Sequence, residues 1–504
     1  MNEEDQTNIQ EFAYKNRLII LGIVLTGIIM SILDGYMVGI ALPNITTSFN
    51  VSITQSQWII SGYLLVLTGL FIFFGKLSEY TGKTKLFMVG WLIFTISSLV
   101  CGLAHEINLL IFFRIVQAVG ASAVAGVSGA ILFHTFPQNE IGKAMGFYGA
   151  AVALGSIIGP VLGGLITNSI GWQYIFLINV PMGVILLIFA MKYLKIPESR
   201  VKNFKIDGKG VILFLVTISS LILFLNEIAQ QMSLELLLIY GLIFIVGITT
   251  FILQERRSNN PMLELSLFKN KKFLFPVLSA LFFTVAINMG IFIGPFYFQG
   301  VMGYNPLQTG IIFMFVPIAM LFVSPLAGKL YDKYHWKYAA GFGALISTAS
   351  FVLLGYAYLM KNLTLILFSL LIWGVGYGLF TSPNTSEALV ALPLEKTAIA
   401  SSVTTTARSL GGSIGVSFAT VLYVLIGLKS INYQSIHSVN SLTISIATIM
   451  IFAGLFGLLA VITSILRNMG SKTAFKPAEH SAPSVNNKCE VEFEKCQETF
   501  DDQK

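Results

Sequence analysis

Asp34 lies inside a long apolar stretch, where a carboxylate is costly and usually has a function. Removal from water favours the neutral carboxyl, whereas a nearby cation favours the ionised form. Asp34 could therefore exchange a proton for a mobile cationic molecule, which is the chemistry of antiport. It stands nine residues before Pro43, so we expect it about 13 Å below the outer surface. The alternative is a structural acid in a fixed salt bridge.

Arg114 is a second charge of this kind, near the start of an apolar stretch that follows Glu106. A guanidinium keeps its proton in a protein, so a buried arginine needs a partner. We expect Arg114 at a depth comparable to that of Asp34, where it would tune proton binding on the carboxylate. The alternative is that its side chain reaches back to the outer headgroups.

Three further polar residues are candidates for a substrate cavity. Arg408 is predicted near mid-membrane, where its charge should face a central cavity. Glu387 lies near the inner end of its apolar stretch, so solvation at the membrane interface explains it as well as substrate binding does. Asn288 lies inside another apolar stretch, and we add it, together with Asp34, to the cavity candidates.

Glycines recur every fourth residue in one stretch, at Gly155, Gly159 and Gly163, with Pro160 and Gly164 beside them. Small residues at this spacing let another helix approach closely, and a proline kinks the helix. The pattern indicates a packing seam. It predicts either an interface that opens and seals on the outer side or ordinary helix packing, and the spacing does not separate the two.

A short charged segment between two apolar stretches occurs twice, which indicates an internal duplication. Its residues are Gly75, Lys76, Glu79, Gly82 and Lys83 in the first copy and Gly328, Lys329, Asp332 and Lys333 in the second. Charges at such a turn can pair with neighbouring helix ends in one conformation and release them in another, so we expect two inner latch loops. The alternative is simple anchoring of basic residues at the cytoplasmic surface.

Composition places these residues in a membrane protein. The 504 residues are 55% hydrophobic and 11% charged, with a mean hydropathy of +0.78. The net charge of +7 does not indicate nucleic-acid binding, because the basic residues punctuate apolar runs instead of gathering on one face. Three cysteines give no metal spacing, no nucleotide-binding loop is present, and we expect no metal, cofactor or enzymatic activity.

Apolar stretches of about 20 residues predict fourteen transmembrane helices. They run near 17–42, 57–74, 86–104, 109–133, 144–167, 172–194, 210–227, 235–253, 273–298, 309–327, 338–359, 363–390, 398–427 and 441–466. With both termini cytoplasmic, all but four of the 31 Lys and Arg residues fall on the inner side, as the positive-inside rule requires.

The predicted fold is an all-α polytopic membrane protein made of two six-helix repeats and an inserted two-helix hairpin. We divide the chain into a cytoplasmic N-terminus (1–16), a first repeat (17–194), a linker with inserted helices 7 and 8 (195–272), a second repeat (273–466) and a disordered cytoplasmic tail (467–504). Duplicated six-helix halves are typical of transporters, which rock about a central site.

Several motifs in the expected order resemble the major facilitator superfamily, and specifically its fourteen-helix drug:proton antiporters. The matching stretches are 33–34 with 41–43, 75–85, Arg114 with Gln117 and Gly120, 155–164, and 171–181. In 75–85, Glu79 and Tyr80 replace the family's usual Asp and Arg. The resemblance covers residues 17 to 466. It implies proton transfer at the Arg114 motif and an antiporter-type contact at 155–164.

Together these features predict a proton-coupled antiporter of the cell membrane that exports amphipathic or cationic drugs by alternating access. Its partners would be a small-molecule substrate, protons and the lipid bilayer, and we expect it to act as a monomer. An alternative on the same scaffold is a dedicated exporter or importer of one metabolite. A transport-dead sensor or assembly partner is another, although the membrane carboxylate argues against it.

Overall fold

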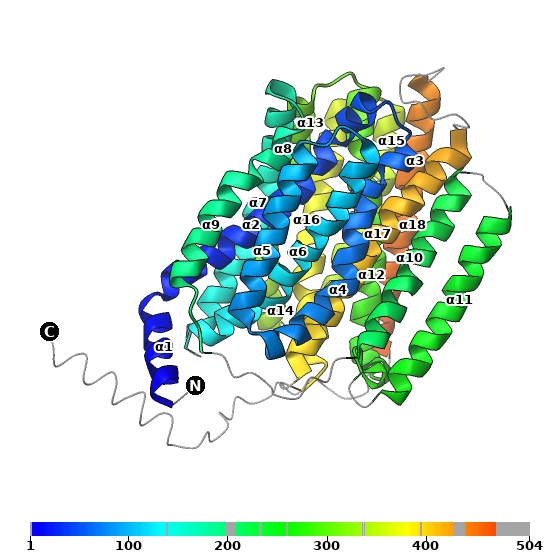
Figure 1. The fold of residues 1–504 in the computed structure, drawn as a ribbon. Coiled ribbons are helices and arrows are strands. Elements are labelled where there is room, and N and C mark those ends of the chain that lie inside the picture. The colour runs from blue at the N-terminus through cyan, green and yellow to red at the C-terminus, as the bar shows by residue number, and fades with distance from the viewer. Residues whose placement is uncertain are drawn as a thin grey trace. The chain divides into compact units, whose positions relative to one another are not determined.

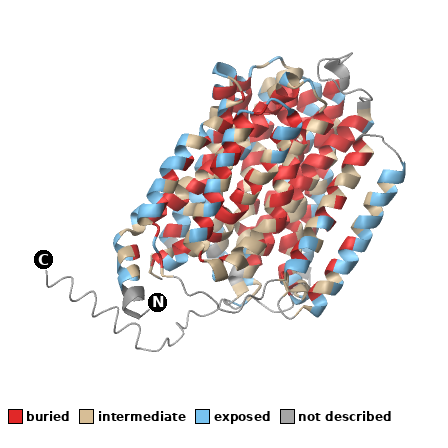
Figure 2. Ribbon diagram, in the orientation of Figure 1, coloured by how far each residue is buried: buried red, intermediate tan, exposed pale blue. Residues whose placement is uncertain are grey.

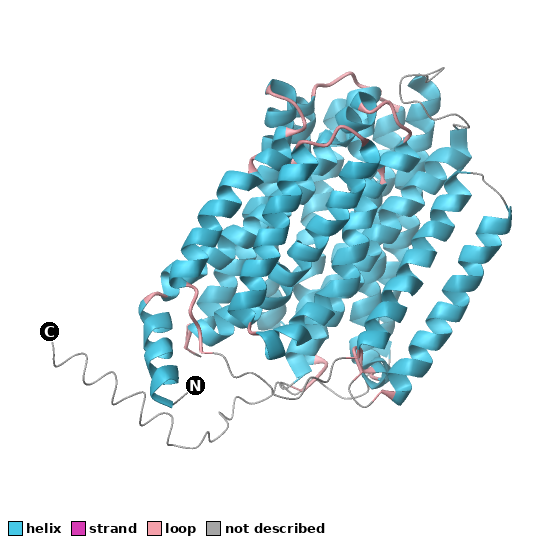
Figure 3. Ribbon diagram, in the orientation of Figure 1, coloured by secondary structure: helices cyan, strands magenta, loops and turns pink. Residues whose placement is uncertain are grey.

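The computed structural model describes residues 3–137, 140–197, 207–230, 234–258, 261–334, 336, 338–393, 396–427 and 439–469. The regular structure in these ranges is helical (Figure 3). The tail predicted from residue 467 lies, from residue 470 on, outside the described residues. The α-helices, labelled in Figure 1, are α1 (Glu3–Lys15), α2 (Arg17–Ser48), α3 (Ile53–Ser56), α4 (Trp58–Thr81), α5 (Lys83–Gly102), α6 (Ile107–Thr135), α7 (Ile141–Ser169), α8 (Tyr174–Leu177), α9 (Asn179–Tyr193), α10 (Gly208–Gln230), α11 (Leu234–Arg257), α12 (Lys271–Gly300), α13 (Pro306–Phe313), α14 (Phe315–Tyr334), α15 (Ala339–Leu359), α16 (Leu363–Val390), α17 (Thr397–Gly427) and α18 (Val439–Met469). A short 3-10 helix, η1 (Leu265–Lys269), lies between α11 and α12.

Fourteen stretches of the described residues are long and apolar enough to cross a bilayer, and each overlaps one predicted span. The predicted number of spans and the all-α fold are therefore confirmed. Three of the stretches are built from paired helices, α3 with α4, α8 with α9 and α13 with α14. A short interruption therefore divides each of these three stretches.

The two predicted charged loops are mostly helical, which corrects the sequence analysis. α4 continues through Gly75, Lys76 and Glu79 to Thr81, and the turn into α5 is made at Gly82, whose φ of +93° suits a residue without Cβ. α14 likewise carries the stretch 328–333. Charged residues one turn beyond an apolar run remain helical because water solvates their side chains while the backbone hydrogen bonds of the helix continue.

The spanning helices pack in two groups that correspond to the duplicated halves. In the first, α2 packs against α7, and α6 against α4 and α5; in the second, α16 packs against α14 and α15, and α12 against α17. The groups meet where α4 packs against α17 and α7 against α13. Buried residues gather along these contacts, and exposed ones lie on the outward faces (Figure 2). Residues on α4, α7, α13 and α17 therefore form much of the contact between the halves.

The extra hairpin, α10 and α11, has one packed member and one peripheral member. α10 contacts both α4 of the first group and α17 of the second. Its Asn226 accepts a hydrogen bond from Gln57 Nε2 at 2.7 Å. α11 has only 11% of its apolar window buried and exposes leucine and isoleucine side chains, as expected of a helix that faces lipid. The inserted pair is thus anchored to both halves through α10.

The first sixteen residues contain a helix that the sequence analysis did not predict. α1 spans Glu3–Lys15 and contacts α2 and α6, with Ala13 only 1% exposed. Lys15 in its last turn suits the helix dipole. A basic residue at this place was a sequence signal for the end of a helix.

Candidate functional site

Asp34 and Arg114 form a buried ion pair between α2 and α6. Arg114 Nη1 lies 2.5 Å from Asp34 Oδ2, and their side chains are 1% and 0% exposed. The other oxygen, Asp34 Oδ1, accepts hydrogen bonds from Gln117 Nε2 at 3.2 Å and Asn179 Nδ2 at 3.0 Å. Gln117 also donates to Ser98 Oγ at 2.7 Å. The carboxylate therefore joins three helices, α2, α6 and α9, through its acceptors.

The guanidinium of Arg114 is held on its remaining sides. Its Nε donates to the carbonyl of Ile59 at 3.3 Å, and Nη1 donates to Gln117 Oε1 at 2.6 Å. The ring of Tyr63 lies against the guanidinium, with 4.2 Å from Cζ to the ring centroid, and that of Phe176 lies at 5.6 Å. A buried ion pair persists only when such contacts offset its desolvation. Protonation of Asp34 would remove the charge around which this arrangement is built.

The helix that carries Asp34 continues well beyond the predicted span end at residue 42. α2 passes through Pro43 and ends at Ser48, so Asp34 lies about 21 Å from that end at 1.5 Å per residue. The hydroxyls of Thr46 and Thr47 bond to carbonyls one turn back, within the continued helix. The carboxylate is thus near the middle of α2.

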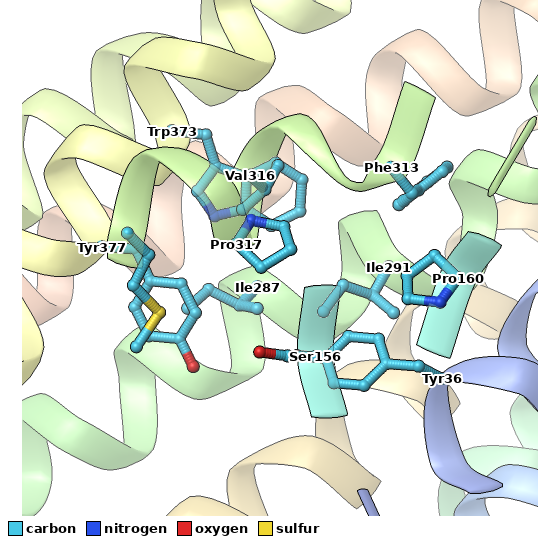
Figure 4. A pocket seen from close by; sticks show the side chains of 11 residues that line it. Tyr36, Ser156, Pro160, Ile287, Ile291, Phe313, Val316, Pro317, Trp373 and Tyr377 are labelled. Carbon is cyan, nitrogen blue, oxygen red and sulfur yellow. The ribbon is translucent and has the colours of Figure 1, made fainter. Parts of the chain in front are cut away.

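A pocket lies between the two groups of helices (Figure 4). It includes about 400 Å³ of space between atoms, counting the part open to solvent. Its wall is mainly apolar and aromatic, with a few polar atoms, as is usual for small-molecule sites. The lining residues are Tyr36 of α2, Ser156 and Pro160 of α7, Ile287 and Ile291 of α12, Phe313 of α13, Val316, Pro317 and Met320 of α14, and Trp373 and Tyr377 of α16.

None of the four cavity candidates, Asp34, Arg408, Glu387 and Asn288, is among the described residues that line this pocket. Arg408 donates through Nη2 to Thr385 Oγ1 at 2.7 Å and interacts electrostatically with Tyr377, which does line the pocket. Asn288 donates to the carbonyl of Thr284, one turn back on its own helix, at 3.0 Å. Arg408 therefore interacts with a residue of the pocket wall without lining the pocket itself.

Glu387 is held in a buried ion pair with Arg467 of α18. The two side chains are 4% and 10% exposed. Glu387 belongs to the last turns of α16, and Arg467 to the last turn of α18. This geometry joins two helices of the second group and directs the carboxylate at a fixed partner.

The glycine stripe of α7 divides between two neighbours. Gly155, Gly159 and Gly163 face α2, where a Cβ on Gly163 would stand 2.6 Å from Met37 Cα. Gly164 instead faces α13 in the other group, where a Cβ would stand 2.4 Å from the carbonyl oxygen of Pro306. Contact between the groups is equally close at Gly310, which abuts the carbonyl of Pro160 at 2.1 Å from an added Cβ. The stripe thus packs within one half, and its end seals against the other.

The first charged segment contacts the linker after α11. Lys76 Nζ donates to the carbonyl of Pro261 at 2.5 Å, and Glu255 accepts from Leu263 N at 2.9 Å. Glu79 is exposed, and Lys83 is half-buried. The same linker is tied to the second group by Glu264, which lies 2.5 Å from Lys396 Nζ.

The second charged segment has fewer described contacts. Gly328 lies against Ser382, since a Cβ there would stand 2.9 Å from Ser382 Oγ. Lys329 and Lys333 are exposed at the end of α14. Asp332 belongs to the same helix, but its side chain lies outside what the structure describes.

Comparison with known proteins identifies the family to which the chain belongs. The sequence profile of the Major Facilitator Superfamily matches residues 24–416, well over half of the chain. The chain belongs to the Major Facilitator Superfamily. It is therefore a membrane transporter by family and by fold.

The curated relatives of this Major Facilitator protein are named for different functions. The riboflavin transporter RibZ of Clostridioides difficile is 34% identical over 412 residues, covering 80% of this chain and 88% of RibZ. The multidrug resistance protein Stp of Mycobacterium tuberculosis is 30% identical over 417 residues, covering 79% and 75%. The multidrug export protein EmrB of Escherichia coli is 28% identical over 425 residues, covering 84% and 82%.

Solved structures of the superfamily share the fold of this transporter. A bacterial homologue of the human lysosomal transporter Spinster, solved in an inward-facing and unoccupied conformation, superposes with a TM-score of 0.65. The alignment covers 91% of this chain and 98% of that chain at 14% identity. At this identity the likeness concerns the fold alone.

The transporter's fold brings some sequence-predicted residues together and separates others. Asp34 and Arg114 meet as expected, whereas Glu387 pairs elsewhere. The aromatic residues of the pocket were missed. Tyr36 and Tyr377 stand in glycine-containing apolar helices, and only their polar hydroxyl amid aliphatic neighbours could have singled them out.

Proposed function

We propose that this transporter is a proton-coupled antiporter that exports amphipathic compounds across the cell membrane. The observation that supports this most is the membrane-buried ion pair of Asp34 and Arg114. An ionisable pair at such depth is costly and is a functional-site hypothesis by default. We keep from the sequence analysis a cytoplasmic location of both termini, a monomer, and the division into two repeats with an inserted hairpin.

Protonation of Asp34 is the proposed coupling step. A neutral carboxyl attracts Arg114 less strongly and accepts less well from Gln117 and Asn179. Because these donors belong to α6 and α9, proton binding would loosen α2 from both. A proton that moves inward gains about 2.3 kcal/mol per 100 mV of membrane potential. That energy is sufficient to shift a two-state equilibrium by more than tenfold.

The alternating states would differ at the contact between the halves. In the present conformation α7 is sealed against α13 through Gly164 and Gly310. Substrate would occupy the pocket between Tyr36 and Tyr377, and opening of this seam would release it outward. The helix ends that carry Lys76 and Lys329 would act as inner latches, which re-form as the inner side closes.

A second candidate is a dedicated transporter of one metabolite. The relationship to RibZ favours it, since that protein is named a transporter of a single compound, riboflavin. The pocket also has few polar atoms, so a specific ligand would be fixed by a small number of donors. A competition panel separates the candidates, because a multidrug pocket accepts structurally unrelated compounds and a dedicated one does not.

The test is gradient-driven uptake into inside-out vesicles. A panel of fluorescent amphipathic dyes of different charge is offered to the native protein, to Asp34→Asn and to Glu140→Gln, a control that removes a half-buried acid paired with Arg17. Antiport predicts uptake of at least one dye that depends on the proton gradient, with loss in Asp34→Asn and retention in Glu140→Gln. Asp34→Glu, which keeps a titratable group, should retain part of the uptake. Uptake that persists in Asp34→Asn would place the coupling site elsewhere.

A further inference from the structure

Among the residues that the structure describes, Arg408 of the apolar helix α17 has no carboxylate partner. Asp34 neutralises Arg114, and Glu387 neutralises Arg467. In the described part of the chain, Arg408 donates a hydrogen bond to a hydroxyl, Thr385 Oγ1, at 2.7 Å. A guanidinium has five N–H donors and keeps its positive charge, so most of the donors of Arg408 remain for an acceptor outside this pair.

Arg408 lies on the face of α17 that is turned toward the contact between the halves. Gly411 and Gly412 lie one turn along α17 on the same face, since residues three and four apart share a helix face. A Cβ on Gly411 would stand 2.5 Å from Leu281 O of α12, and one on Gly412 would stand 3.2 Å from Leu64 of α4. Arg408 therefore faces the region enclosed by helices of both halves.

Tyr377 connects this cation to the pocket. It lies within electrostatic range of Arg408 and lines the pocket (Figure 4). Tyr377 also lies within electrostatic range of Tyr36, on the opposite wall. Tyr36 and Tyr377 thus lie on two walls of the pocket, and Arg408 interacts with Tyr377 without lining the pocket itself.

The pocket wall offers hydrogen-bond donors and aromatic faces. Trp373 is 1% exposed, and its indole Nε1–H has no hydrogen-bond partner among the residues that the structure describes. Tyr36 and Tyr377 add hydroxyl groups, and Phe313 adds a further ring. No aspartate or glutamate is among the residues that line the pocket. A buried donor left without a partner in the protein is satisfied when a ligand supplies an acceptor.

We propose that the pocket selects flat aromatic compounds that carry negative charge or carbonyl acceptors, with Arg408 and Trp373 as the residues that determine this selectivity. The proposal rests on the proposed function, in which this pocket holds the transported compound. Aromatic rings stack on the tyrosines, acceptors meet the indole N–H, and negative charge meets the guanidinium. A cationic compound would face Arg408 with no carboxylate to offset it, contrary to the cationic substrates expected from sequence.

The test compares two dyes that share one tricyclic core and differ in charge. Fluorescein is anionic, and tetramethylrhodamine methyl ester is cationic. Binding of each to the purified full-length protein in lipid nanodiscs is measured by fluorescence polarisation, without a proton gradient. The native protein should bind fluorescein about tenfold more tightly than the cationic dye, as expected for one charge-assisted hydrogen bond.

Two variants and one control test whether Arg408 and Trp373 determine the selectivity. Arg408→Gln should weaken fluorescein binding about tenfold and leave the cationic dye unchanged or improved. Trp373→Phe keeps a ring but removes the donor, and it should weaken fluorescein severalfold. Lys272→Gln removes an exposed positive charge at the start of α12 and should change neither dye. Thermal unfolding establishes that each variant is folded.

Several outcomes would overturn the proposal. These are tighter binding of the cationic dye, binding of neither dye, an equal loss of both dyes in folded Arg408→Gln, or an equal effect of Lys272→Gln. The result is separable from the proposed function. Selective binding of fluorescein without gradient-driven uptake would reject antiport and keep the selectivity, whereas gradient-driven uptake of cations alone would do the reverse.

Discussion

Arg114 Nη1 of α6 and Asp34 Oδ2 of α2 lie 2.5 Å apart, and neither side chain is more than 1% exposed. The two residues are 80 positions apart in the chain. Gln117 and Asn179 complete the hydrogen bonding of the carboxylate. Because each charge is buried and satisfied mainly by the other, removal of one should have a different effect from removal of both.

Asp34→Asn should destabilise the protein by about 3–5 kcal/mol, because it leaves Arg114 as an unpaired buried charge. The double variant with Arg114→Gln should regain most of that stability and still lack proton-coupled transport. Unfolding in detergent, arranged as a double-mutant cycle, measures the coupling. Glu140→Gln is the matched control, since its 3.2 Å pair with Arg17 is about 30% exposed and should contribute at most about 1 kcal/mol. Equal stability of Asp34→Asn and the native protein would contradict the prediction.

Gly164→Ala should favour the outward-open conformation. The added Cβ would stand 2.4 Å from the Pro306 carbonyl, so the seam between α7 and α13 cannot close fully. Spin labels at Asn168 and Ile311, in a background without native cysteines, should report a longer distance. Gly149→Ala in the same helix has no atom within 4 Å of its Cβ and should leave the distance unchanged. Identical distances in both variants would show that the seam tolerates a methyl group.

Gly120→Ala should destabilise the first half by about 1–3 kcal/mol. Its Cβ would meet the Gly90 carbonyl oxygen at 2.5 Å and the backbone nitrogen of Phe94 at 2.7 Å, and neither backbone can move independently. Gly129→Ala, also in α6, meets nothing within 4 Å and should be neutral or slightly stabilising through helix propensity. Thermal unfolding of the two variants measures the difference, and equal midpoints would refute the close-packing argument.

Glu387→Gln should lower stability without a change in substrate affinity. The substitution leaves Arg467 without its carboxylate at a site where the two side chains are 4% and 10% exposed. Charge exchange, Glu387→Arg with Arg467→Glu, should recover part of the loss. Thermal unfolding and dye binding are measured on the same preparations. A folded Glu387→Gln variant that loses binding would restore Glu387 as a substrate residue.

Glu264→Gln should loosen the linker that follows α11, but only slightly. The pair with Lys396 is more than a third exposed on each side, so it contributes at most about 1 kcal/mol. Hydrogen exchange of the η1 amides, Leu265–Lys269, should rise by less than about tenfold and should rise less at high salt. The exposed acid Glu79 provides the control as Glu79→Gln. A larger effect would assign this linker a greater role in holding the halves together.

The sequence by itself determined the class of the protein, its fourteen crossings and the residues whose charge is out of place in a membrane. These properties are local. Twenty apolar residues cross a bilayer as a helix whatever their partners are, because the backbone has no other way to satisfy its hydrogen bonds in lipid. Asp34 and Arg114 could be singled out for the same reason, since an intramembrane charge is costly in any surroundings.

The tertiary structure decided which charges pair and what lines the pocket. Asp34 pairs with Arg114, Glu387 with Arg467, and Arg408 with no carboxylate in the described part of the chain. Sequence could not distinguish these outcomes, because partners 80 residues apart are chosen by how helices cross and rotate. Tyr36 and Tyr377 were missed for a related reason. An aromatic side chain is stable against lipid, in a protein core or around a ligand. Only the packing of the helices decides which of these surroundings it has.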